Sequence, residues 1–312
     1  MATTGVPAGR FGLGDVMALA TVALWGASFT VIKSAYREFT PLGFAAVRFA
    51  IASAALLVLL AVMRRPLAIA RADLARVAAV GASHVGLYQI FFSLGLRDTT
   101  ASHSVLLINT APVMTMALVW LTRSERVIAR QVAGMLLAGA GVATLVAASG
   151  SVSPGHLRGD LLTLLAAAAY AATPVIVLPL YARYSTLTVL AGAMLAGAAM
   201  LLIVGAPELA RQSWRLTPAA WLQLLYAAIG AGALGYVFWY EGIRRIGPTR
   251  TAAYSYLIPA VGVLSAVAIL REPFGVLHGL GAVVILAGVA LARWPAATAS
   301  IGSSAQPART PR

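Results

Sequence analysis

The sequence predicts an all-α polytopic membrane protein with ten transmembrane helices, arranged as two inverted five-helix repeats. Three observations predict this fold class. Of the 312 residues, 60% are hydrophobic and 10% are charged, and the mean hydropathy is +0.87. The chain contains ten apolar runs, each long enough to cross a bilayer, which takes about 20 residues. The second half also repeats the residue pattern of the first half.

The ten apolar runs follow one another with short interruptions that contain Arg, Pro or Gly. Because ten crossings use about two thirds of the chain, the loops are too short for a soluble catalytic, nucleotide-binding or DNA-binding domain. The first run is expected to be a retained helix, since no small-residue cleavage site follows it. The expected helices are residues 15–35, 41–63, 74–96, 101–121, 131–149, 160–182, 187–206, 219–243, 251–270 and 274–294.

The positive charges predict the orientation of the helices. With a cytoplasmic N-terminus, the inner segments hold 15 Lys and Arg residues and the outer segments hold seven, while Arg48 lies within a helix. Positive residues concentrate on the cytoplasmic side, so both termini are expected in the cytoplasm of a bacterial inner-membrane protein. Topology therefore accounts for the net charge of +14, and no nucleic-acid partner is expected.

The repeat sets the expected domain organisation. A shift of 145 residues aligns Trp25 with Tyr170, and a shift of 147 aligns Pro112 with Pro259. Because each copy has an odd number of helices, the second copy crosses the membrane in the opposite sense. We expect a cytoplasmic N-terminus (1–14), a first repeat (15–149), an extracytoplasmic linker (150–159), a second repeat (160–294) and a disordered cytoplasmic tail (295–312).

The order and double occurrence of these residues resemble the drug/metabolite transporter superfamily, specifically the EamA-type ten-helix permeases. The resemblance implies export of metabolites, amino acids or drugs through a cavity between the halves, with helices five and ten at the periphery. Ala193 stands where the second repeat would match Arg48, so the role of this arginine is not symmetric. The resemblance is carried by Trp25-Gly26-x-x-Phe29, Pro41 with Arg48, Pro112 and Pro259, Glu125 and Glu272, Gly134/Gly141 and Gly281/Gly288.

The candidate substrate site lies near the middle of the membrane. His84 is about 15 Å into the third helix, at 1.5 Å per residue, and Tyr88 follows it on the same face. Trp25 and Tyr170 reach this depth from helices one and six. Ionisable groups at this depth usually face a cavity, and rings around a few polar groups suit small amphipathic solutes. Alternatively, His84 is a packing residue bonded to a backbone carbonyl, and the rings only fill the core.

Prolines inside the expected helices indicate further candidates. Pro112 and Pro259 each remove a backbone hydrogen bond, three residues after Asn109 and Tyr256, and Pro174 interrupts helix six. Such breaks supply polar groups or hinges near a cavity, or they are simple kinks. We predict that Asn109 and Tyr256 bind substrate together with the aromatic residues, and that the three prolines act as gates or hinges.

The acidic residues limit the possible chemistry. All nine fall at expected helix ends or in loops, with Asp15 and Asp160 predicted to cap helices one and six. Glu125 and Glu272 are expected to fix the corners after helices four and nine. No carboxylate pair at depth, metal-ligand set or cysteine indicates a catalytic, metal or cofactor site, so no enzyme is predicted. His84 is then the best candidate for any proton coupling, and without coupling the protein is a facilitator.

These observations predict an inner-membrane transporter that exports small metabolites, such as amino acids or related amphipathic solutes, by alternating access through a central cavity. Its expected partners are a small-molecule substrate and the lipid bilayer, and no oligomeric state is predicted. The alternatives are a multidrug efflux permease, which an acidic residue in the cavity would favour, and a channel.

Overall fold

The computed structural model describes residues 11–121, 129–150, 154–246, 251 and 254–293, and in these ranges every regular element is helical. The first repeat begins with two long helices, and its third and fourth crossings are each built from consecutive shorter pieces. The pieces are α1 (Leu13–Ala35), α2 (Pro41–Val62), η1 (Arg71–Asp73), α3 (Leu74–Gly81), η2 (Ala82–Leu87), α4 (Tyr88–Asp98), α5 (Ala101–Ile108), α6 (Ala111–Leu121) and α7 (Ala129–Gly150).

The second repeat has the same succession of five crossings, most of them subdivided at breaks. Its elements are α8 (Pro154–Ala171), α9 (Thr173–Tyr181), α10 (Thr186–Arg211), α11 (Pro218–Leu225), η3 (Tyr226–Leu234), α12 (Gly235–Ile246), η4 (Ser255–Leu257), α14 (Ile258–Ser265), η5 (Ala266–Leu270) and α15 (Val276–Arg293).

The described helices have the length and composition of membrane spans. Six of them are long and apolar enough to cross a bilayer, and two shorter apolar helices cover Ile258–Leu270 and Val276–Leu291. The helical segments coincide with the ten predicted crossings, which confirms the all-α polytopic fold class. The continuous apolar composition explains this agreement, because only helices satisfy all backbone groups within a single segment in lipid.

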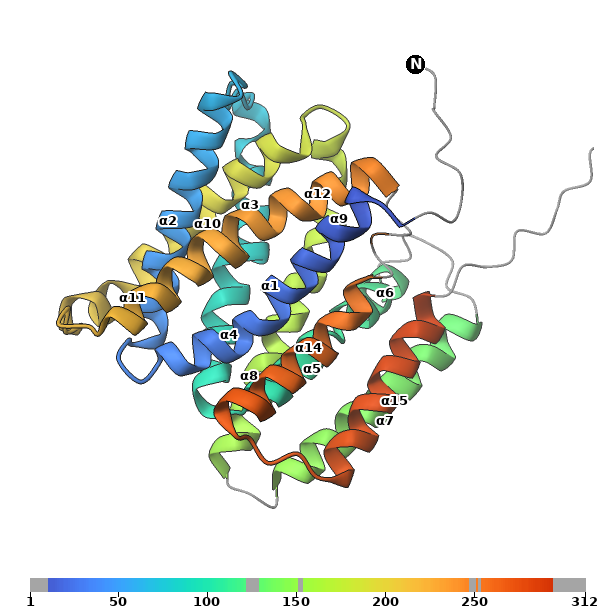
Figure 1. The fold of residues 1–312 in the computed structure, drawn as a ribbon. Coiled ribbons are helices and arrows are strands. Elements are labelled where there is room, and N and C mark those ends of the chain that lie inside the picture. Colours follow the sequence, from blue (N-terminus) through green and yellow to red (C-terminus); the bar gives the residue numbers. More distant parts are fainter. Residues whose placement is uncertain (1–10, 122–128, 151–153, 247–250, 252–253, 294–312) are drawn as a thin grey trace, which may run out of the picture.

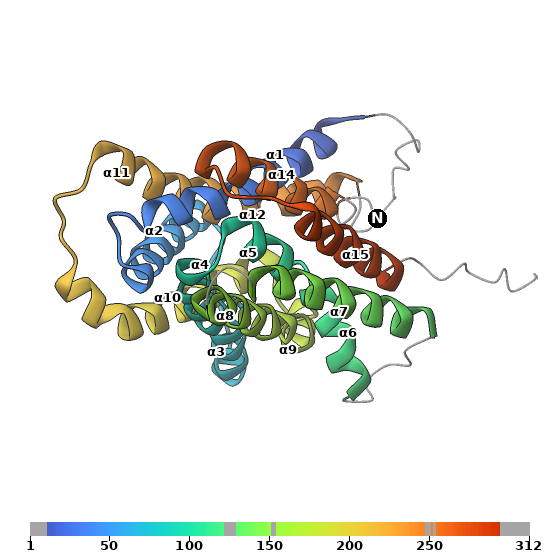
Figure 2. The same cartoon turned by 90° about the horizontal axis from the view of Figure 1, so that it is seen from below.

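The two repeats interlock instead of standing side by side. Helix α1 of the first repeat packs against α12 and α14 of the second, and α8 of the second packs against α4 and α5 of the first. These contacts are equivalent under the repeat. In Figures 1 and 2 these helices occupy the middle of the bundle, with α2 and α10 at one edge and α7 and α15 at the opposite edge. The predicted peripheral helices five and ten are therefore packed on each other.

Glycines of the two repeats meet where α7 crosses α15. A Cβ atom added to Gly288 would lie 2.7 Å from the carbonyl oxygen of Gly134, and one added to Gly141 would lie 3.0 Å from that of Gly281. The two backbones can approach this closely only because these positions have no side chain. The glycine pairs that recur in the sequence thus form one reciprocal contact.

The structure corrects the predicted capping role of Asp160 and agrees with that of Asp15. Helix α8 begins at Pro154, six residues before the expected start, so Asp160 lies in its second turn and is fully buried. Proline is favourable in the first turn of a helix, which is why a segment expected to be linker is helical. Asp15 is the third residue of α1, and its carboxylate accepts a hydrogen bond from the N–H of Gly12, the N-cap (2.9 Å).

The three predicted hinge prolines share one structural position. Pro112, Pro174 and Pro259 are each the second residue of a new helical piece, namely α6, α9 and α14. There the missing N–H costs no helical hydrogen bond. Each proline therefore follows a break in a membrane crossing, and a hinge role for them stays a prediction.

Candidate functional site

Aromatic side chains of both repeats form one continuous series of ring contacts, which we call the aromatic cluster. His84 lies 5.1 Å from Tyr170 and 5.9 Å from Tyr236, and Tyr236 lies 5.1 Å from Trp25, measured between ring centroids. Four of the predicted site residues therefore meet in this cluster. In order of contact its members are Trp239, Trp25, Tyr236, His84, Tyr170, Tyr88, Phe92 and Phe29.

Two π-helical segments position the cluster. His84 lies in η2 and Ala231 lies in η3, and these positions are equivalent in the repeat. The Nε1–H of Trp25 donates to the carbonyl of Ala231 (2.9 Å), while Tyr170 packs on the ring of His84. Each repeat thus places an aromatic residue on the π-segment of the other. Such π-turns are frequent at functional sites.

Tyr236 connects the two halves of the cluster, and sequence reasoning missed it. Its hydroxyl lies 3.1 Å from Nε2 of His84, and the Nδ1 atom of this histidine is buried without a hydrogen-bond partner in the described part of the chain. Tyr236 aligns with Gln89, directly after Tyr88, in the first repeat. The sequence signal was that Tyr236 aligns with a position one residue after Tyr88, which places it at the depth of the other rings.

The other predicted residues lie outside the aromatic cluster. The side-chain amide of Asn109 donates to the carbonyl of Val105 one turn earlier (2.8 Å), at the break between α5 and α6. The carboxylate of Glu272 accepts hydrogen bonds from the N–H groups of Ala101 (2.7 Å) and Ser102 (2.9 Å), at the start of α5. Glu125 and the side chain of Tyr256 fall outside the described residues, so their roles stay predictions.

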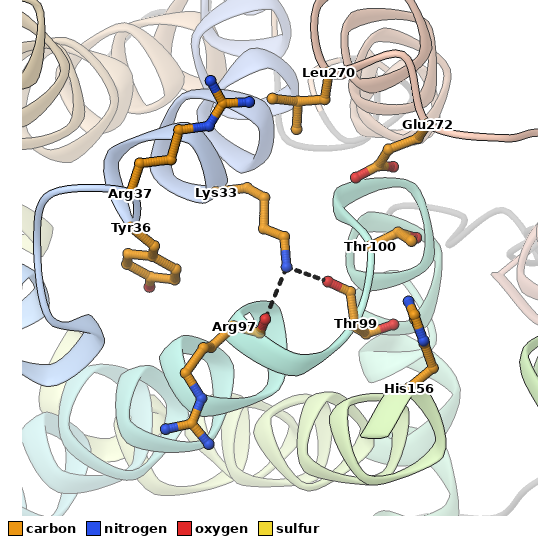
Figure 3. Close-up of a pocket in the computed structure, with 9 residues that line it drawn as sticks. All are labelled: Lys33, Tyr36, Arg37, Arg97, Thr99, Thr100, His156, Leu270 and Glu272. Atoms are coloured by element: carbon orange, nitrogen blue, oxygen red, sulfur yellow. Dashed lines mark hydrogen bonds between the residues drawn. The ribbon is translucent and has the colours of Figure 1, made fainter. Parts of the chain in front are cut away.

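An open pocket of about 430 Å³ lies at the end of the bundle that the charges predict to be extracytoplasmic. Figure 3 shows Lys33, Arg37 and Arg97 around it, with Tyr36 on one side and His156 on the other. We call it the outer pocket. The amine of Lys33 donates to three backbone carbonyls at 2.7–2.8 Å, so it caps the end of α4.

One face of α1 links the outer pocket to the aromatic cluster. Trp25, Phe29, Lys33 and Tyr36 follow at intervals of three or four residues, so they share this face. The ring of Phe29 packs on that of Phe92 at 5.4 Å, and both side chains are buried. Phe29 therefore lies between Trp25 and Lys33 along this face, and Phe92 packs on it.

Arg48 has partners in the structure that the sequence did not indicate. It is 8% exposed, its Nε–H donates to the carbonyl of Ala227 (3.2 Å), and its Cζ lies 4.8 Å from the ring centroid of Phe49. Ala227 lies in η3, four residues before Ala231, whose carbonyl accepts the hydrogen bond from Trp25. A buried cation thus lies about one helical turn from the contact between Trp25 and η3.

A buried histidine and aspartate lie behind the outer pocket, which the sequence did not indicate. Nδ1 of His103 lies 3.2 Å from Oδ2 of Asp160, and Asp160 also accepts a 2.5 Å hydrogen bond from the hydroxyl of Thr99. The expectation that every acidic residue lies at a helix end or in a loop is therefore wrong for Asp160. It failed because the start of helix six was placed too late.

Known proteins resemble this chain over most of its length. A probable terminal-alkyne amino-acid exporter of Streptantibioticus cattleyicolor is 29% identical over 87% of this chain and 90% of its own. A probable amino-acid metabolite efflux pump of Salmonella typhimurium is 28% identical over 88% and 92%. An uncharacterized transporter of Archaeoglobus fulgidus is 26% identical over 88% and 96%.

Fold and family comparisons agree with these relatives. One solved crystal structure superimposes with a TM-score of 0.60 and 21% identity, covering 90% of this chain and 96% of the other, which shows a common fold. The model of the EamA-like transporter family matches twice, at residues 12–147 and 157–307. The inverted repeat and the family match lead to the same conclusion: this chain is a multi-pass membrane protein that belongs to the EamA-like transporter family.

Proposed function

We propose that this protein exports small amphipathic metabolites, such as amino acids, from a bacterial cell by alternating access. The aromatic cluster is the proposed binding site. The observation that carries the proposal is the construction of this cluster from equivalent positions of two inverted repeats. A site built in this way can be exposed to either side of the membrane when the repeats exchange conformations.

The chemistry of the aromatic cluster suits an amphipathic solute. Its rings offer apolar area, and polar atoms such as the buried Nδ1 of His84 can bond to a ligand. No carboxylate is among the described ring contacts and hydrogen bonds of the cluster. It therefore suits a solute with its own polar groups better than a cationic drug. The two relatives named as amino-acid or amino-acid metabolite exporters support the same substrate class.

The geometry also supports a sequence of access. Lys33 of the outer pocket, Phe29 and Trp25 follow one another on one face of α1, and Phe29 packs on Phe92. In the proposed cycle these two rings move apart when the site opens outward. We further propose that both chain termini lie on the cytoplasmic side of the membrane, as the charge distribution predicts.

The proposal is tested by substrate affinity per folded molecule. In purified protein, Trp25→Ala and Tyr170→Ala are expected to lower affinity for a transported amino acid about five- to hundredfold, the equivalent of ~1–3 kcal/mol of lost ring contact. Glu272→Gln weakens a carboxylate cap at the start of α5, in the lining of the outer pocket and outside the ring contacts of the aromatic cluster, so it is expected to lower the yield of folded protein with little change in affinity. Loss of affinity in Glu272→Gln but not in the two alanine variants would place the site elsewhere.

A further inference from the structure

Arg48 is a buried cation whose hydrogen-bonding capacity is mostly unused. The guanidinium group carries five N–H donors and stays charged in proteins. Only the Nε–H has a hydrogen-bond partner in the part of the chain that the structure describes, the carbonyl of Ala227. The four N–H bonds of the terminal nitrogens therefore remain available. An unpaired buried charge is costly, so this arrangement points to an anion that is present during the transport cycle.

The surroundings of Arg48 offer this anion a defined place. The carbonyl of Ala227, to which Arg48 donates, lies in η3, four residues before the carbonyl of Ala231 that binds Trp25. No described salt bridge joins Arg48 to a carboxylate. An anion bound by this guanidinium would therefore lie about one helical turn from the contact that the aromatic cluster makes with η3.

The repeat makes this site one-sided. The position that matches Arg48 in the second repeat is Ala193, which is buried. Aromatic residues occur at equivalent positions of both repeats, but the second repeat has no cation equivalent to Arg48. A solute that has a carboxylate at one end and an apolar group at the other would therefore bind in one orientation.

We propose that Arg48 binds the carboxylate of the transported solute, while the apolar part of the solute lies against the aromatic cluster. The inference rests on the proposed function and names its substrate class: amphipathic monocarboxylates, including apolar amino acids. The planar guanidinium can hold both carboxylate oxygens at once, which an ammonium group does not do with the same geometry.

The test compares a carboxylate with the matching amide. Binding of L-phenylalanine and of L-phenylalaninamide is measured by calorimetry on the purified full chain in detergent. The wild type is expected to prefer the acid. Arg48→Gln is expected to reduce this preference roughly 10- to 100-fold, as the loss of a charge-assisted pair predicts, while affinity for the amide changes little.

Two further variants keep the test interpretable. Arg48→Lys retains the positive charge but lacks the planar guanidinium group, so it is expected to keep part of the preference for the acid over the amide. If Arg48→Gln does not fold, the comparison is made with Arg48→Lys instead. Arg65→Gln, at an exposed loop position, is the matched control and should retain the full preference. An equal loss of acid and amide binding in the Arg48 variants would overturn the inference alone. A wild type that binds neither ligand would overturn the proposed function as well.

Discussion

A single side chain from each repeat is anchored on the other repeat. Trp25 donates to the carbonyl of Ala231, and Tyr170 packs on His84, at equivalent positions of the two halves. Because the contacts cross between the repeats, movement of one half must rearrange rings contributed by the other. The proposed binding residues are therefore also the residues whose contacts would change with conformation.

Two histidines inside the bundle, His84 and His103, lead to different predictions about pH. His84 contacts rings and the Tyr236 hydroxyl, whereas His103 faces Asp160 and lies 5.0 Å from the ring of His278. If His84 sets the pH dependence of transport, His84→Gln should flatten the activity profile between about pH 5.5 and 8, around the reference histidine pKa of ~6.5. Transport into proteoliposomes measures this.

The matched variant for this experiment is His103→Gln. A profile that is unchanged in His84→Gln but flattened in His103→Gln would assign the titrating group to the pair with Asp160. In that case the predicted role of His84 in proton coupling is wrong, and only measurements of substrate affinity would then test whether His84 binds substrate.

At the scale of helices, close approach of backbones holds the periphery together. The α7 and α15 helices meet through glycines, and a Cβ added to Gly288 would lie 2.7 Å from Cα of Ala138. That distance is far below van der Waals contact, and the obstructing atom belongs to a backbone that cannot rotate away. The two helices must separate to admit even a methyl group.

Gly288→Ala is therefore expected to destabilise the protein by about 1–3 kcal/mol through overpacking. Gly139→Ala is the control, because a Cβ at Gly139 meets nothing within 4 Å. Thermal unfolding in detergent should show a lowered midpoint for Gly288→Ala and an unchanged or slightly raised one for Gly139→Ala. Equal midpoints in the two variants would mean that α7 and α15 do not pack as described.

For the whole molecule, the interlocked repeats bring the first and last described helices to a common end. The start of α1 and the end of α15 lie at the same end of the bundle, opposite the loop that joins η5 to α15 (Figure 1). An even number of crossings requires this arrangement. The outer pocket lies at the opposite end, where Glu272 of that loop lines it.

The orientation of this assembly in the membrane is testable because the chain contains no cysteine. A cysteine at Ser213, in the exposed connection between α10 and α11, is expected to react with an impermeant maleimide in intact cells. One at Ala68, in the exposed connection after α2, should react only after the membrane is opened. The reverse pattern would show that the termini face outward.

Local patterns in the sequence determined the succession of helices and the depth of the rings. An apolar run of about 20 residues must form a helix in lipid, because a helix satisfies its backbone hydrogen bonds within the segment. The rise per residue of the helix then determines how deep Trp25, His84 and Tyr170 lie. The same patterns placed each proline beside a break. The start of helix six was missed because proline and glycine were treated as interruptions, although proline suits the first turn of α8.

Only the tertiary structure decided which of these residues meet. Tyr236 joins the rings of both repeats, Arg48 of α2 donates to the carbonyl of Ala227 in η3, and His103 reaches Asp160 across 57 residues of sequence. Each contact joins segments that are far apart in the chain, and helical periodicity does not specify which face of one helix meets which face of another. That choice depends on side-chain packing between helices, which exists only in the assembled bundle.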